Sequence, residues 1–184
     1  MSDAQILRFP QFDGYVTVSF ERNKGMITMR GSLSAKGLGI ALGESLPKAR
    51  EVVDRKGMQI AWMSPDELMV FCPKRKVADL LAALERSLRR QHALLSDVSD
   101  ARAVFTLNGA NVREVVAKLA PVDMAPSQFG PREIRRTRFG QIATVFWMTG
   151  EDELKIICFR SVAEYMYKQL CLCATQGSEL DLWT

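Results

Sequence analysis

The feature that most constrains this chain is a repeat between its two halves. The segment AWMSPDELMVFCP, residues 61–73, is followed by a similar segment, FWMTGEDELKIICF, residues 146–159. The tripeptide WMS of the first corresponds to WMT of the second, and Cys72 corresponds to Cys158 if one residue is inserted in the turn between them. Similarity at a fixed distance along a chain predicts two related structural units that pack together.

The predicted secondary structure follows the same order in both halves. The criteria are β-rich runs bounded by turn residues, apolar positions at helical spacing, and helix-capping patterns. In the first half we expect strands at 15–20, 26–30, 57–64 and 67–73, a weak helix at 32–43 and a helix at 76–90. In the second half we expect strands at 94–100, 102–109, 133–140, 141–150 and 152–159, and helices that begin at the capping boxes Asn111/Glu114 and Ser161/Glu164.

Further matches extend the repeat over most of the chain. Laying MITMRGS over VFTLNGA aligns Thr28 with Thr106 and Gly31 with Gly109. We therefore predict an α+β fold of two duplicated units, residues 1–92 and 93–184, packed together as one compact domain with antiparallel sheets and flanking helices. Trp62 and Trp147, on the repeated strands, are expected to anchor the core because aromatic side chains on strands bury large areas.

Composition limits the class of protein. No apolar run approaches the roughly 20 residues of a membrane span, and the N-terminus lacks the features of a signal peptide, so we expect a cytoplasmic protein with no membrane partner. The chain has four cysteines without a C-x-x-C pair and a single histidine, His92, so no metal site is expected. Cys72 and Cys158 are expected to be buried on strands.

The sequence contains no catalytic motif that we can identify. P-loop, nucleophile-elbow and zinc-protease patterns are missing, and GLGIALG has the wrong glycine spacing for a dinucleotide loop. Asp97 and Asp100 are expected to cap a turn rather than to act as general acid or base, and His92 is expected at the surface. No catalytic residue is therefore assigned.

Arginines crowd one predicted strand, at positions 132, 135, 136 and 138. Alternation along a strand places Arg136 and Arg138 on one face and Arg135 on the other, so Arg136 and Arg138 are candidates for binding a carboxylate or phosphate. The net charge is only +4, and no RNA-binding signature accompanies the basic residues, so no nucleic-acid partner is expected.

Three segments resemble the gamma subunit of heterotetrameric sarcosine oxidase: LLSDVSDARAVFTLNGANVREVVAKLAPVDM, IRRTRFGQIATVFWM and LKIICFRSVAEYMYKQL. The resemblance runs from about Gly25 to Cys173 and is most specific at D-x-S-D-A-R, L-x-G and C-F-R-S-V-A-E-Y. Residues 93–172 are more distantly similar to the folate-binding domain of the glycine-cleavage T-protein and of dimethylglycine dehydrogenase. The implied fold, a duplicated folate-binding-domain (T-protein-like) architecture, agrees with the repeat.

The resemblance also implies a place in a complex. Such complexes oxidise sarcosine to glycine with oxygen, form peroxide and pass the one-carbon unit to tetrahydrofolate. The resemblance assigns FAD, FMN and NAD to the alpha and beta subunits, zinc to delta, and the tetrahydrofolate chemistry to subunits other than gamma. For this chain it implies no cofactor, a structural role, and alpha as the most direct partner, with beta and delta in the same complex.

One position departs from the T-protein pattern. In T-proteins a strand with a pattern like G-x-I-D-D carries two aspartates that contact folate and assist the one-carbon chemistry. Here FGQIATVFWM places Ala143 and Thr144 at those positions. Neither side chain ionises near neutral pH, so neither can move a proton.

Three hypotheses follow. The first is a non-catalytic subunit that stabilises a sarcosine oxidase complex, with Leu180, Leu182 and Trp183 as candidate contacts and a frayed terminus as the alternative for that tail. The second is a folate-binding module without catalysis, in which Arg136 meets the glutamyl carboxylate. The third, RNA binding, requires an affinity that falls steeply with salt.

Overall fold

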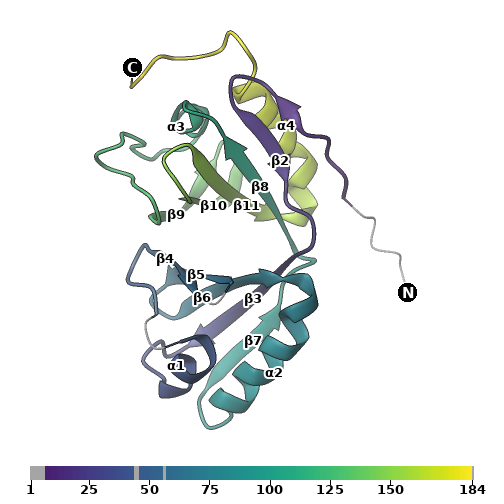
Figure 1. The fold of residues 1–184 in the computed structure, drawn as a ribbon, viewed down its shortest axis with the longest axis vertical. Helices are drawn as coiled ribbons and strands as arrows, with labels where there is room; N and C mark the ends of the chain where they lie inside the picture. Colours follow the sequence, from purple (N-terminus) through teal and green to yellow (C-terminus); the bar gives the residue numbers. More distant parts are fainter. Residues whose placement is uncertain (1–6, 44–45, 56, 184) are drawn as a thin grey trace.

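The protein has four layers, in which two antiparallel sheets pack face to face between helices (Figure 1). The computed structural model describes residues 7–43, 46–55 and 57–183. One sheet is covered on its outer face by α1 (Lys36–Leu42) and α2 (Val77–Leu88), and the other by α3 (Val112–Ala117) and α4 (Ala163–Cys173). The predicted α+β class with antiparallel sheets and flanking helices is confirmed.

One sheet has six strands and the other has five among the described residues. The six-stranded sheet has the order β1 (Phe12–Asp13), β2 (Thr17–Phe20), β8 (Arg102–Asn108), β11 (Glu153–Phe159), β10 (Ile142–Met148), β9 (Ile134–Phe139). The five-stranded sheet has the order β4 (Val52–Arg55), β5 (Met58–Ser64), β6 (Glu67–Pro73), β3 (Lys24–Gly31), β7 (Ala93–Asp97). Two short 3-10 turns, η1 (Lys74–Lys76) and η2 (Arg160–Val162), lead into α2 and α4.

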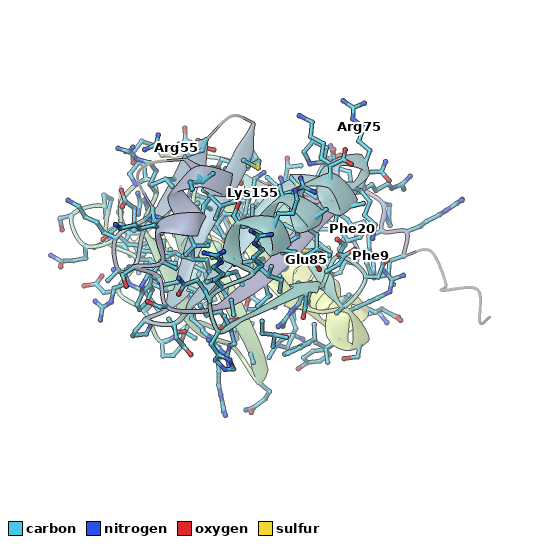
Figure 2. The ribbon with its side chains drawn as sticks, turned by 90° about the horizontal axis from the view of Figure 1, so that it is seen from below. Phe9, Phe20, Arg55, Arg75, Glu85 and Lys155 are labelled. Carbon is cyan, nitrogen blue, oxygen red and sulfur yellow. The ribbon has the colours of Figure 1, made fainter. Side chains whose placement is uncertain are left out.

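Strand alternation divides the buried side chains among three apolar layers. Each sheet packs one face against its own helices, and the two remaining faces pack against each other. The layer between the sheets includes Met26, Phe71, Val104 and Trp147. At the outer edge of the six-stranded sheet, Phe9 packs edge-on against Phe20, with ring centroids 5.2 Å apart (Figure 2).

Each half of the chain contributes a strand from near its start to the sheet of the other half. β2, from the first half, pairs with β8 in the six-stranded sheet, whereas β7, from the second half, pairs with β3 in the five-stranded sheet. The division into residues 1–92 and 93–184 therefore separates two repeats of the sequence but not the two sheets. As a domain boundary it stays a prediction.

Main-chain contacts also join the sheets at their opposite edge, beside β4 and β9. The N–H of Val52 donates to the carbonyl of Arg132 at 2.8 Å, and the N–H of Ile134 donates to the carbonyl of Arg50 at 3.0 Å. Arg50 and Arg132 both have left-handed backbones, with φ of 63° and 67°. The two bonds are reciprocal, as expected for units related by an approximate two-fold axis.

The duplicated-unit prediction holds in backbone detail at Gly31 and Gly109. Their φ angles are 147° and 148°, a region that favours glycine. Each N–H donates to the carbonyl of an equivalent aspartate, Gly31 to Asp66 and Gly109 to Asp152, at 2.9 Å in both cases. The sequence match at these glycines therefore reflects a shared turn geometry.

The repeated tryptophans, however, are not structurally equivalent. Leu68, Val70 and Cys72 face the outer layer of one sheet as Leu154, Ile156 and Cys158 do in the other. With that register, Trp62 corresponds to Met148, because they pair with Leu68 and Leu154, and Ala61 corresponds to Trp147. The pairing of β5 with β6 shifts between Trp62 and Ser64, so Met63 is the extra residue of a β-bulge.

Because of this bulge, one prediction about the core is wrong. Trp147 is 1% exposed and stacks on Phe71 between the sheets, with ring centroids 5.1 Å apart. Trp62 is only partly buried and lines an open groove at the edge of the sheets. The prediction that both tryptophans anchor the core is right for Trp147 and wrong for Trp62, because the bulge shifts Trp62 by one position relative to Trp147.

Candidate functional site

The candidate site is a cavity of about 110 Å³ between the sheets, next to Ala143. The five-stranded sheet contributes β5 and β6, and the six-stranded sheet contributes β8, β9, β10 and β11. This cavity contains the positions at which T-proteins carry their aspartate pair, together with Arg136. Its charged side chains are Glu67, Arg102 and Arg136.

Ala143 and Thr144 point to opposite faces of β10. Val145 and Trp147 lie between the sheets, and alternation places Ala143 on that same face. Thr144 is 4% exposed and lies on the other face, where its hydroxyl donates to the carbonyl of Ile157 at 2.6 Å. Neither side chain presents an acid or base to the cavity.

The arginines of β9 alternate as predicted. Arg136 and Arg138 share the face of Ile134, which lies in the layer between the sheets, whereas Arg135 lies on the other face over the ring of Phe129. Arg138 lies at the exposed end of the strand, outside the cavity, and makes no ion pair among the residues described. Only Arg136 of the two candidates reaches the cavity.

Glu67 holds Arg136 in place. The same carboxylate oxygen, Oε2, lies 3.0 Å from Arg30 and 3.2 Å from Arg136, and Glu67 itself is 7% exposed. This ion pair joins β6 of one sheet to β9 of the other. In the sequence, Glu67 stands out only as part of the repeat, because its partner Arg136 belongs to the opposite sheet.

Arg102, the first residue of β8, also lines the cavity. Its guanidinium lies 3.7 Å from the ring centroid of Phe159, and its buried Nε has no hydrogen-bond partner within the described structure. Desolvation lowers the pKa of Arg102; nearby Glu67 opposes this and Arg136 adds to it. In the sequence, Arg102 stands out only as the last residue of the D-x-S-D-A-R motif, which gives it no role of its own.

The aspartates, the histidine and the two strand cysteines considered in the sequence do not line the cavity. The Asp97 carboxylate accepts a hydrogen bond from the N–H of Ser99 at 2.9 Å, so it caps its turn as predicted. Asp100 forms an ion pair with Lys74 at 2.8 Å. His92 is exposed, as predicted. Cys72 and Cys158 are buried on strands, as predicted, and burial raises the pKa of the Cys158 thiol to about 12.

The C-terminal tail is held against α3. The Glu114 carboxylate accepts hydrogen bonds from the N–H groups of Leu180 and Leu182 at 2.8 and 2.9 Å. Leu180, Leu182 and Trp183 nevertheless stay 48%, 49% and 37% exposed. The predicted helix start at Asn111 is right, but the capping box is wrong: the Asn111 side chain makes no capping bond, and the Glu114 carboxylate is bonded to the tail.

The second predicted capping box is also wrong, because Ser161 lies inside η2 and α4 begins without a side-chain cap.

None of the helices within residues 7–43, 46–55 and 57–183 is long and apolar enough to cross a membrane. The part of the N-terminus used in the signal-peptide argument that spans residues 1–6 lies outside the described residues. The same described ranges contain no group of three or more His, Cys, Asp or Glu side chains arranged to hold a metal ion.

Comparison with known sequences finds relatives described as gamma subunits of sarcosine oxidase. The "Sarcosine oxidase subunit gamma" of Corynebacterium sp. strain U-96 is 29% identical over 150 residues, which cover 80% of this chain and 72% of that protein. That of Corynebacterium sp. strain P-1 is 29% identical over 150 residues, covering 80% and 73%. That of Arthrobacter sp. is 28% identical over 142 residues, covering 76% and 69%.

Two solved structures share the fold. A chain of the heterotetrameric sarcosine oxidase from Corynebacterium sp. U-96, in complex with pyrrole 2-carboxylate, matches with a TM-score of 0.81 and 26% identity, over 89% of this chain and 87% of that one. The glycine cleavage system aminomethyltransferase T from Bartonella henselae matches with a TM-score of 0.63 over 83% of this chain and 44% of that one, and at 14% identity this shows the shared fold alone.

The family model agrees with these matches in extent. The model described as "Sarcosine oxidase, gamma subunit family" matches residues 31–176, which include most of both repeats and the whole candidate cavity. This chain therefore belongs to the sarcosine oxidase gamma subunit family.

Proposed function

We propose that this chain is the non-catalytic gamma subunit of a heterotetrameric sarcosine oxidase and that it stabilises the complex, with alpha as its most direct partner. The observation that carries the proposal is the match, over 89% of the chain, to a chain of such a heterotetramer. The cavity supports the non-catalytic part, because Ala143 and Thr144 offer no ionisable group and Glu67 is engaged by two arginines. On this proposal FAD, FMN, NAD, zinc and tetrahydrofolate act on the other subunits.

The tail is the surface we assign to partner contact. Its backbone is fixed by Glu114 while the side chains of Leu180, Leu182 and Trp183 stay partly exposed, so little chain entropy remains to be lost on binding. Ordered, exposed apolar side chains of this size are typical of interaction surfaces.

Co-expression tests the proposal directly. This chain is co-expressed with the alpha, beta and delta subunits, the complex is analysed by size-exclusion chromatography with mass detection, and sarcosine-dependent peroxide is assayed with and without the chain. We expect the chain to elute with the complex and its omission to reduce the yield or stability of the complex. A chain that never joins the other subunits would refute the proposal.

A matched pair of variants tests the surface. Leu182→Ser on the tail is expected to lower recovery of the chain in the complex. Ile40→Ser replaces another exposed apolar residue, 81% exposed on α1, and is expected to leave recovery unchanged. Equal recovery of both variants with the complex would remove the tail from the interface while leaving the subunit role intact.

A folate-binding role without catalysis is the second candidate. It is favoured by an open groove of about 600 Å³ beside the cavity, which shares Met63 and Arg136 with it and is also lined by Arg50 and Trp62. It ranks second because Arg136 would have to leave Glu67 to meet a glutamate of the ligand, which would leave the largely buried Glu67 carboxylate with one arginine fewer. Calorimetric titration of the chain with tetrahydrofolate tests it, and a lack of binding at millimolar ligand would exclude it.

A further inference from the structure

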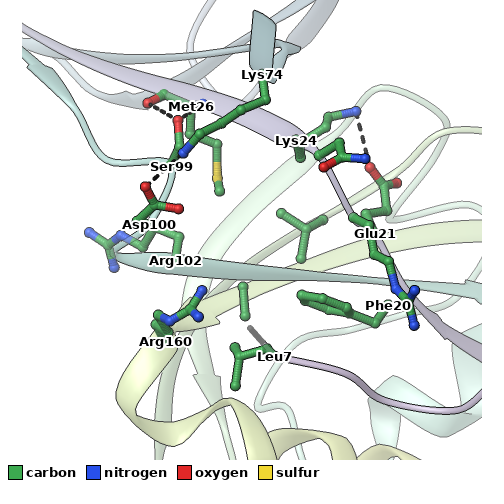
Figure 3. A pocket seen from close by; sticks show the side chains of 14 residues that line it. Leu7, Phe20, Glu21, Lys24, Met26, Lys74, Ser99, Asp100, Arg102 and Arg160 are labelled. Atoms are coloured by element: carbon green, nitrogen blue, oxygen red, sulfur yellow. Dashed lines mark hydrogen bonds and ion pairs between the residues drawn. The ribbon is translucent and has the colours of Figure 1, made fainter. Parts of the chain in front are cut away.

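A second cavity, of about 260 Å³, lies where the two crossovers between the sheets meet the 3-10 turns (Figure 3). Its walls come from residues within 20–24 and 99–104 and from Lys74 and Arg160, which begin η1 and η2. It is distinct from the cavity beside Ala143, although Arg102 lines both. Neither the family resemblance nor the proposed subunit role gives this second cavity a purpose.

The sequence repeat places cations at matching positions around this cavity. Lys24 is equivalent to Arg102, and Lys74 is equivalent to Arg160. The equivalences follow from the pairing of Lys24 with Pro73 and of Arg102 with Phe159, and from the N–H bonds of Lys74 to Asn23 and of Arg160 to Ala101, at 2.9 and 3.0 Å. Both units of the duplicated fold therefore bring two positive charges to the same approximate two-fold axis.

The cavity carries more positive than negative charge. Its lining contains five cationic side chains, Arg22, Lys24, Lys74, Arg102 and Arg160, and two acidic ones, Glu21 and Asp100. Both acids are engaged by lysines, Glu21 by Lys24 at 3.1 Å and Asp100 by Lys74 at 2.8 Å. Arg102 makes no ion pair among the described residues. Positive potential therefore remains inside a partly enclosed space, where it is screened less than at an open surface.

The helix dipoles favour negative charge beside this cavity, and Asp79 and Glu164, the acids in the first turns of α2 and α4, do not line it. Residues 74–76 and Arg160 precede α2 and α4, at the ends where the helix dipole favours negative charge. Cations near a helix N-terminus destabilise the helix, and an anion bound between the starts of the two helices would offset this effect. The same location on both repeats makes an anion site a better account than a solvated basic face.

Apolar side chains line part of the cavity. In Figure 3 Leu7 lies at the bottom, Phe20 lies across from Arg160, and Met26 lies at the top beside Ser99. Met26 and Val104, which also lines the cavity, are only 2% and 1% exposed. We propose that this cavity binds a small organic anion with an apolar body, whose carboxylate meets Arg102 and Arg160 while its body packs on Phe20 and Met26. Arginine suits this role because its planar fork matches a carboxylate.

Benzoate is a suitable probe, because it combines one carboxylate with a compact apolar ring. The full chain, labelled with ¹⁵N, is titrated with benzoate at low salt and followed by amide chemical shifts. We expect saturable shifts at residues 22–24, 100–104 and 160, and an apparent affinity that falls as salt is added. Benzyl alcohol, which has a similar shape but no charge, is expected to bind much more weakly.

Two variants and a control test whether Arg102 and Arg160 contact the carboxylate of benzoate. Arg160→Gln and Arg102→Gln are each expected to weaken benzoate binding by about tenfold or more, since each removes a charge-assisted contact. Arg75→Gln is the matched control, because Arg75 is the neighbour of Lys74 in η1 but points away from the body of the protein (Figure 2). If Arg102→Gln fails to fold, Arg160→Gln alone decides.

The proposal fails if millimolar benzoate shifts no amide of this cavity. It also fails if benzyl alcohol binds as tightly as benzoate, which would indicate an apolar site without charge recognition. Equal weakening by Arg75→Gln and Arg160→Gln would show that benzoate responds only to overall charge. All three outcomes are independent of whether the chain joins a sarcosine oxidase complex.

Discussion

At the scale of single residues, Trp147 tests the packing between the sheets. Its side chain is 1% exposed and stacks on Phe71, but its Nε1 is buried without a hydrogen-bond partner among the described residues. Trp147→Ala is expected to lower the unfolding free energy by about 3–5 kcal/mol. Trp147→Phe should cost much less, because it keeps an aromatic ring and removes the unsatisfied donor.

Urea unfolding followed by circular dichroism measures both changes. Trp62→Ala is the control, because Trp62 is partly exposed and the loss should be clearly smaller than for Trp147→Ala. If Trp147→Phe lowered the unfolding free energy as much as Trp147→Ala, the indole Nε1 would have to make a stabilising hydrogen bond that phenylalanine cannot replace.

Glu21 gives the molecule a stability that depends on pH. Burial by itself would raise its pKa, but hydrogen bonds from Lys155 and Thr106 and the charges of Lys24 and Lys155 lower the pKa below its ordinary value of 4.5. A carboxyl with a lower pKa in the folded state stabilises the fold above the ordinary value, and this stabilisation is lost as the pH falls through the folded value.

We therefore expect the unfolding free energy to decline below about pH 4.5 and the decline to be shallower in Glu21→Gln. Chemical unfolding at a series of pH values measures the slope. Glu85→Gln, at an exposed site on α2 (Figure 2), is expected to leave the slope unchanged. Identical slopes in Glu21→Gln and the unaltered chain would contradict this assignment.

Residue positions within one strand could be predicted from sequence, whereas partners from other strands could not. Alternation correctly separated Arg135 from Arg136, because a strand has a fixed period of two. The Glu67 partner of Arg136 comes from the other sheet, and no local pattern encodes that contact. Trp62 was misplaced because a β-bulge adds a residue that leaves no mark in composition.

At the scale of elements, α3 acts as the clamp for the C-terminal tail. Glu114 is 3% exposed and accepts the N–H groups of Leu180 and Leu182. Glu114→Ala is expected to speed hydrogen exchange at these two amides by about tenfold or more, since hydrogen bonds to a charged group contribute about 1.5–3 kcal/mol each. Glu85→Ala removes an exposed glutamate from α2 and should leave their exchange unaltered. Slow exchange in Glu114→Ala would mean that the tail is held by its apolar contacts instead.

Element order and some element ends, such as those of β6, were predictable from sequence, but the capping contacts of the helices were not. Apolar runs bounded by turn residues correctly predicted strands around β5, β6, β10 and β11, and apolar positions at helical spacing correctly predicted helices around α2 and α4. Both predicted capping boxes failed, since Glu114 is engaged by the tail and Ser161 lies inside a 3-10 turn. Competition from tertiary contacts and local turns is invisible to a four-residue pattern.

At the scale of the whole molecule, the duplication places the candidate cavity between the two sheets and the second cavity where the crossovers between the sheets meet the 3-10 turns. The halves are tied together on one side by the exchanged strands β2 and β7 and on the other by the bonds of Val52 and Ile134. The repeat itself was readable from sequence. The exchange was not, since β2 and β7 have the same composition whichever sheet they join.

The exchange predicts that neither half folds alone. Residues 1–92 would lack β7 at one edge of the five-stranded sheet and would leave β2 without β8, while the layer between the sheets would be exposed to water. Residues 93–184 would lose β2 and the same apolar layer. Each half expressed alone is expected to give a poorly dispersed amide spectrum, whereas mixing the two should restore the dispersion of the full chain. A cooperative melt and a well-dispersed spectrum of residues 1–92 alone would contradict this expectation, and would support the boundary at residue 92 as a true domain boundary.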